Sequence, residues 1–132
     1  MLFNLFKPKP DNNQLFTLSY TLSDHFRGYK RFPMVVQGNI ESENNNAAFS
    51  GTKFSGHTIT FNLCKSKDNL YYFDVLIDGR KVGAIFDQDH IKELRTNKIT
   101  AVYAKNDIEK VATSDGFYER NRIHLFVKYK EG

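Results

Sequence analysis

Apolar and polar residues alternate over much of the chain, and this period of two predicts β-strands. The last alternating segment is typical, because Ile123, Leu125 and Val127 take one side and His124 and Lys128 the other. About seven segments follow this pattern, namely 16–22, 34–40, 57–64, 71–77, 80–86, 99–104 and 122–130. A Ser-Asp-Gly turn at 114–116 predicts one more short hairpin within 106–119. Residues 99–104 are apolar on both faces, which predicts a central strand.

A hairpin at 71–86 is the best-defined unit. Asp78-Gly79 is a two-residue loop of the type I′ kind, since both residue types tolerate a positive φ. The predicted register brings three apolar pairs together, namely Val75 with Val82, Phe73 with Ala84 and Tyr71 with Phe86.

A short helix is predicted directly after this hairpin. Asp87 is the expected N-cap, and Asp89 falls in the first turn, where the helix dipole favours an anion. Phe86 is expected to staple against Ile91, and the helix to end near Asn97.

The segment 41–56 is rich in Asn, Ser and Gly and predicts a long loop. Loops of this length in compact domains are functional or disordered, and we expect Asn44 to Asn46 to be mobile. Phe49 and Phe54 indicate that part of the loop folds back on the body.

These elements predict an α+β, mainly β fold, with a curved or barrel-like antiparallel sheet and one short helix across an end. The chain of 132 residues, 40% apolar, suits one domain at 15–132 after an N-terminal tail at 1–14.

The single cysteine, Cys64, cannot form an internal disulfide, which favours a reducing, cytoplasmic setting. The six mostly apolar residues at the start are too few for a signal peptide or a membrane span. They could dock on a partner or pack on their own domain.

The net charge of +4, with a pI of about 9.1, is a modest excess spread along the chain. The segment 25–32 concentrates it, because cations alternate there with aromatic residues. Cations hold phosphates and aromatic rings stack on bases, so this pattern suits single-stranded nucleic acid. The candidate binding residues are Arg27, Tyr29, Lys30 and Arg31. The alternative is an ordinary strand or loop with aromatics inward and cations in solvent.

No motif indicates catalysis. The four histidines lie far apart, and none has a metal-ligand spacing from another histidine or from Cys64. No phosphate loop or dinucleotide fingerprint is present. We therefore expect no enzyme activity, no metal and no cofactor.

Residues 72–94 resemble the middle of the HIRAN domain family, in which a strand, a Gly turn, a V-G strand and a short helix recur. The matching positions are Val75, Ile77, Gly79, Val82, Gly83, Ile91 and Leu94. The resemblance implies a small, mostly β, OB-like fold, and eukaryotic members attached to helicase-like proteins hold the 3′ end of single-stranded DNA. The family's N-P-Y-D-x-N-A run is replaced here by residues 68–74, and Ala84 stands where a polar residue often follows V-G. The family's binding pocket is therefore not carried over.

Two functions follow as hypotheses. The first is a non-catalytic module that binds single-stranded nucleic acid. The second is a protein-interaction or accessory module of a bacterial or phage system, which would meet its partner through residues 1–6 or 41–56.

Overall fold

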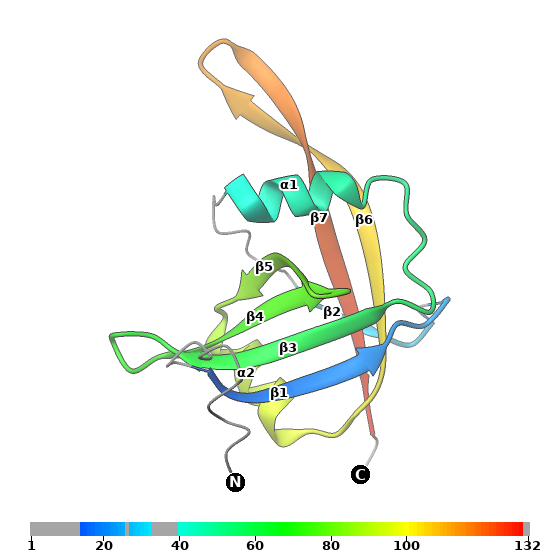
Figure 1. The fold of residues 1–132 in the computed structure, drawn as a ribbon, viewed down its shortest axis with the longest axis vertical. Helices are drawn as coiled ribbons and strands as arrows, with labels where there is room; N and C mark the ends of the chain where they lie inside the picture. The colour runs from blue at the N-terminus through cyan, green and yellow to red at the C-terminus, as the bar shows by residue number, and fades with distance from the viewer. Residues whose placement is uncertain (1–13, 26, 33–39, 131–132) are drawn as a thin grey trace, which may run out of the picture.

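The computed structural model describes residues 14–25, 27–32 and 40–130, and the account below concerns these residues (Figure 1). They form seven strands and two helices, and six of the seven predicted strand segments overlap strands of the structure. The elements are β1 (Gln14–Thr21), β2 (Lys30–Phe32), α1 (Ile40–Ala48), β3 (Thr58–Lys65), β4 (Tyr71–Ile77), β5 (Arg80–Ile85), α2 (Gln88–Thr96), β6 (Ile99–Thr113) and β7 (Gly116–Tyr129).

The strands form two antiparallel sheets. Sheet A has the order β1-β3-β4-β5, and sheet B has the order β2-β7-β6. The fold is therefore mainly β with two helices, in agreement with the predicted class. The central position expected for 99–104 is wrong, because β7 lies in the middle of sheet B and β6 at its edge. Of the strand predicted at 34–40, residues 34–39 lie outside the described residues and Ile40 begins α1.

One hydrophobic core lies between the sheets and takes residues from both, from α2 and from the segment after α1. Its largest fully buried side chains include Phe61 and Phe73 from sheet A and Ile123 and Leu125 from sheet B. Burying each such side chain contributes roughly 1.5–3 kcal/mol.

The two sheets do not close into a barrel within the described residues. They meet at one side, where the Ser23 N–H donates to the Val102 carbonyl at 2.8 Å. On the other side α1 packs against both β5 and β7 (Figure 1). Asn45 and Asn46 of α1 donate side-chain N–H groups to the carbonyls of Lys81 and Val82 on β5, at 2.7 and 3.1 Å. The helix thus provides hydrogen-bond donors to carbonyl groups at the edge of β5, which in a closed barrel would pair with a neighbouring strand.

The β4–β5 turn is as predicted, with φ of 50° at Asp78 and 81° at Gly79. The predicted register holds only beside the turn, where Leu76 pairs with Lys81. A one-residue shift follows, so that Val75 pairs with Gly83 and Phe73 with Ile85. The predicted pairs Val75–Val82 and Phe73–Ala84 are therefore wrong. The extra residue, Val82, forms a β-bulge at the point where α1 reaches the edge of β5.

Helix α2 begins and ends where the sequence predicts. The Asp87 carboxylate accepts hydrogen bonds from the N–H groups of Asp89 and His90, and Asn97 is the C-cap. Phe86, expected to staple against Ile91, is 39% exposed and stacks on Tyr72 with ring centroids 5.5 Å apart.

The long loop predicted at 41–56 is wrong for its first half, which forms α1. Ser42 and Asn46 of α1 and Phe49, directly after it, are buried at the spacing i, i+4, i+7, which is one face of a helix. The mobility expected at Asn44 to Asn46 is contradicted as well, because Asn45 and Asn46 bond to β5 and Asn46 is fully buried. Two of the three residues on this buried face are polar, so hydrophobicity did not reveal the helix.

The ends of β6 and β7 project beyond α1 as a two-stranded ribbon (Figure 1). We call residues 107–122 the arm; the chain reverses at Ser114-Asp115, at the predicted turn. Three large apolar side chains of the arm are exposed, with exposed fractions of 63% for Ile108, 62% for Phe117 and 45% for Tyr118.

Neither described helix is long and apolar enough to cross a membrane. Residues 1–6, one of the two expected partner segments, lie outside the described part of the chain.

Candidate nucleic-acid interface

The four candidate binding residues lie at and after the turn that leads into β2. Arg27 is exposed, in the turn beside Gly28. Tyr29 is half-buried, and its hydroxyl donates to Ser23 Oγ at 3.2 Å. This hydrogen bond turns the Tyr29 hydroxyl toward the segment that precedes the turn.

Lys30 and Arg31 belong to β2, where Lys30 pairs with Val127 and Arg31 with Phe126. The joint role of the four residues in binding stays a prediction.

Two aromatic residues mark the outer face of sheet B, which points away from the core. Tyr103 of β6 pairs with Phe126 of β7, and their ring centroids are 5.8 Å apart. Both side chains are half-buried, whereas their neighbours Val102 and Val127 are buried in the core. The register extends this row to Arg31 of β2, so one candidate residue belongs to the same row as the aromatic pair.

An open pocket of about 660 Å³ lies beside Tyr103, and we call it the Tyr103 pocket. It is lined by Asp24, His25, Arg27, Tyr103 and Lys128. Arg27 and Lys128 are exposed, as cations that meet phosphate groups must be. The pocket thus combines an aromatic ring with two cations from separate segments of the chain.

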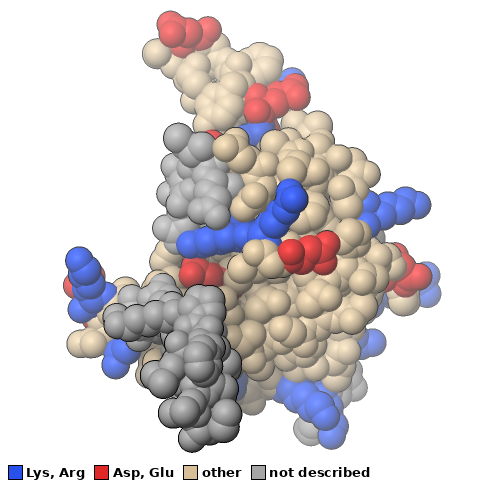
Figure 2. Space-filling view, in the orientation of Figure 1, with Lys and Arg blue, Asp and Glu red and all other residues tan. Residues whose placement is uncertain are grey.

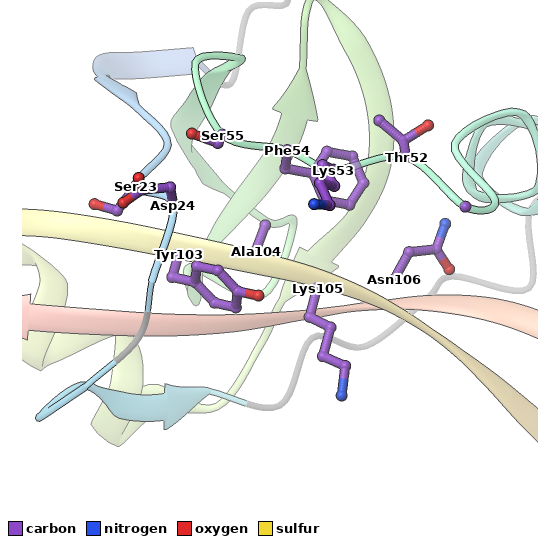
Figure 3. A pocket seen from close by; sticks show the side chains of 11 residues that line it. Ser23, Asp24, Thr52, Lys53, Phe54, Ser55, Tyr103, Ala104, Lys105 and Asn106 are labelled. Carbon is purple, nitrogen blue, oxygen red and sulfur yellow. The ribbon is translucent and has the colours of Figure 1, made fainter.

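A second pocket, of about 500 Å³, adjoins the first and also borders Asp24 and Tyr103. We call it the Lys53 pocket; it is lined by residues 23–24, 51–55 and 103–106. Figure 3 shows Tyr103 and Lys105 on one side of β6 and Ala104 and Asn106 on the other, toward the segment 52–55. Asn106 is fixed there, because its side-chain N–H donates to the Asn46 carbonyl at 3.0 Å.

Acidic residues accompany the cations around these pockets. Asp24 Oδ1 lies 2.8 Å from His25 Nδ1, and Lys105 Nζ lies 3.4 Å from Asp107 Oδ1. Such exposed ion pairs contribute at most about 1 kcal/mol. Figure 2 shows basic and acidic residues interspersed on the face that it displays. On that face they form no single basic stripe.

The clearest pKa shifts lie outside the two pockets. A hydrogen bond from His57 lowers the pKa of Asp78, and burial raises the pKa of Tyr129 above its usual value, with a further contribution from Glu93. Within the described residues no group of three or more His, Cys, Asp or Glu side chains could hold a metal ion.

Tyr103, Phe126, Lys128 and Asp24 were not among the candidate residues from the sequence. Tyr103 and Phe126 alternate with core residues in predicted strands, and this alternation was the available signal that they face outward. Their pairing, and their position near Arg27, depend on strands far apart in the chain.

The chain matches no protein-family model, no curated protein and no solved structure.

Proposed function

We propose that this protein is a non-catalytic module that binds single-stranded nucleic acid at the outer face of sheet B. The observation that carries the proposal is the Tyr103 pocket, where one aromatic ring lies with Arg27 and Lys128 around about 660 Å³ of open space. This volume is within the range of small-ligand sites.

In the proposed complex a base stacks on Tyr103 while Arg27 and Lys128 contact the phosphates on either side of it. Aromatic rings accept any base, and each stacked base contributes about 1–3 kcal/mol. Each phosphate contact releases counterions and adds about 0.7 to the slope of log affinity against log salt for single strands. Two contacts support only weak, salt-sensitive binding.

Two sequence features support the proposal. The chain carries a net charge of +4, and Arg27 belongs to the cation-rich segment singled out from the sequence. The resemblance of residues 72–94 to the HIRAN family, whose helicase-associated members bind single-stranded DNA, agrees in ligand class. The residues that carry this resemblance belong to the β4–β5 hairpin and to α2, and none of them lines the Tyr103 pocket.

Fluorescence anisotropy of labelled ten-nucleotide single strands, measured at several salt concentrations, tests the proposal. We expect Tyr103→Ala to weaken binding by about 1–3 kcal/mol. The double variant Arg27→Ala, Lys128→Ala should reduce the salt slope by about 1.4, since two phosphate contacts are lost.

The control variants remove the same kinds of side chain, an aromatic ring and a cation, at positions outside the Tyr103 pocket. Tyr118→Ala removes an exposed aromatic residue of the arm, and Lys67→Ala removes an exposed lysine in the β3–β4 turn. Both should bind as the wild type does. Absence of binding at low salt, or an equal loss with the control variants, would refute the proposed site.

The arm supports a second candidate function, the binding of another protein. Ile108 and Phe117 are more than 60% exposed on the face of the arm that continues the core side of sheet B. An isolated two-stranded ribbon is only marginally stable in water, so a protein partner would stabilise this one. On the other face Glu109 is 3.2 Å from Arg120 and 2.9 Å from Arg122, so one carboxylate offsets part of the charge of two cations. The arm is therefore better suited to a protein than to phosphates.

Sedimentation velocity over a range of protein concentrations tests self-association through the arm. If a second copy covers the arm, the wild type forms oligomers and the double variant Ile108→Ser, Phe117→Ser stays monomeric. A wild-type protein that is monomeric at every concentration would exclude a second copy as the partner.

A further inference from the structure

Asp24 occupies an unexpected position for a site that binds an anion. Its side chain borders both the Tyr103 pocket and the Lys53 pocket, and it is about three-quarters exposed. A carboxylate beside a phosphate site weakens binding through like-charge repulsion. Its presence between two pockets that also share Tyr103 therefore requires a different explanation.

The chemistry of a carboxylate limits what Asp24 can contact. An ionised carboxylate accepts hydrogen bonds only, and its two oxygens offer about four acceptor sites. Asp24 Oδ1 contacts His25 Nδ1, which leaves further acceptor capacity on the same group. Among the groups of a nucleic acid, the exocyclic amino groups of cytosine, adenine and guanine donate hydrogen bonds, whereas thymine or uracil has a carbonyl at the corresponding position, which only accepts, and donates only through its ring N3–H.

We propose that Asp24, at the junction of the two pockets, accepts a hydrogen bond from the exocyclic amino group of the base stacked on Tyr103. The site then prefers strands that contain cytosine over strands that contain only thymine or uracil. The inference depends on the proposed function, because it assigns a base preference to the same site.

The arrangement around Tyr103 separates the roles of the charged residues. Arg27 and Lys128 line the Tyr103 pocket, while Lys53 and Lys105 line the adjoining one, so both pockets carry cations. Asp24 lines both pockets, as Tyr103 does. In the proposed complex the base on the ring presents its edge to Asp24, with its phosphates directed toward the cations.

The experiment compares labelled oligo-dC and oligo-dT, each of ten nucleotides, by fluorescence anisotropy at pH 7.5 and one low salt concentration. We expect the wild type to bind oligo-dC about fivefold more tightly, the low end of the discrimination from a base-edge contact. In Asp24→Asn this ratio should fall to about one, because an amide can accept from cytosine and donate to thymine equally. Oligo-dT should bind Asp24→Asn more tightly than it binds the wild type, because the carboxylate that repels its phosphates is gone.

Two controls separate the contact from other effects. Asp68→Asn removes an exposed acidic charge in the β3–β4 turn and should leave the ratio unchanged. Asp115→Asn removes an exposed acidic charge at the tip of the arm and should likewise leave the ratio unchanged. Equal binding of the two strands by the wild type, or a preference that survives in Asp24→Asn, would overturn the inference and leave the proposed function standing. Absence of binding to both strands would overturn the proposed function and the inference together.

Discussion

Replacing Asn46 with alanine tests how α1 closes the open side of the fold. Asn46 is fully buried, and its side-chain N–H donates to the carbonyl of Val82 at the β-bulge. The variant removes this donor and leaves the carbonyl without its partner from α1. The contact between the Asn106 side chain and the Asn46 backbone carbonyl remains, so the Lys53 pocket keeps its wall.

The expected loss of stability is the sum of three effects. A buried acceptor left without its partner costs about 1–3 kcal/mol. Two effects offset part of this cost. Alanine is a better helix former than asparagine by about 0.5 kcal/mol. In addition, Asn46 Oδ1 has no hydrogen-bond partner among the described residues, so its removal relieves a desolvated group. We therefore expect a net destabilisation of about 1–2 kcal/mol.

Guanidinium denaturation followed by circular dichroism measures this change, because the described residues have defined strands and helices and the chain has no tryptophan to follow. Asn44→Ala is the matched control, since Asn44 is an exposed residue of the same helix. It gains helix propensity without losing a buried contact, and we expect it to be more stable than the wild type by about 0.5 kcal/mol. A thermal melt should show Asn46→Ala lowered by several degrees, at about 4 °C per kcal/mol for a chain of this size.

Equal stability of Asn46→Ala and Asn44→Ala would refute the role assigned to Asn46, and with it the account of how α1 replaces a closing strand. The affinity of Asn46→Ala for oligonucleotides should match that of the wild type. A loss of affinity in a folded Asn46→Ala protein would show that the binding site extends to α1.

Two further changes test the β4–β5 turn. Gly79→Val should destabilise the fold by about 1–2 kcal/mol, because φ is 81° and no neighbouring atom lies within 4 Å of an added Cβ, so the cost comes from the backbone alone. In chemical denaturation Gly79→Asn should lose less, and equal losses for the two variants would contradict this reasoning. The pKa of Asp78 lies below its usual 3.8, chiefly because of the hydrogen bond with His57. The ionised carboxylate therefore stabilises the fold at pH values above 3.8, and this stabilisation is lost as the pH falls through the lowered pKa. Thermal melts should therefore show Asp78→Asn less stable than the wild type at pH 5 and similar to it near pH 2; parallel curves over this range would be inconsistent with the shift.

The sequence by itself determined the elements whose signals are local. Alternation with a period of two predicted the strands, since one face of each had to meet the core. Asp78-Gly79 predicted its turn because few residues tolerate a positive φ, and Asp87 predicted the start of α2 because its carboxylate satisfies N–H groups within the same turn. These features depend on residues within four positions of one another.

Only the tertiary structure decided the rest. The buried face of α1 includes the polar residues Ser42 and Asn46. Asn46 is held by contacts with strands 36 and 60 residues away, through its bond to Val82 and the bond from Asn106. The register of β5 shifts at a bulge that the same helix covers, so the turn could not determine it. The candidate interface formed in the same way, because Arg27, Tyr103 and Lys128 come from three segments that meet only when sheet B assembles. Pairing between distant strands is set by the packing of the whole chain, and the order of residues within one segment does not contain that information.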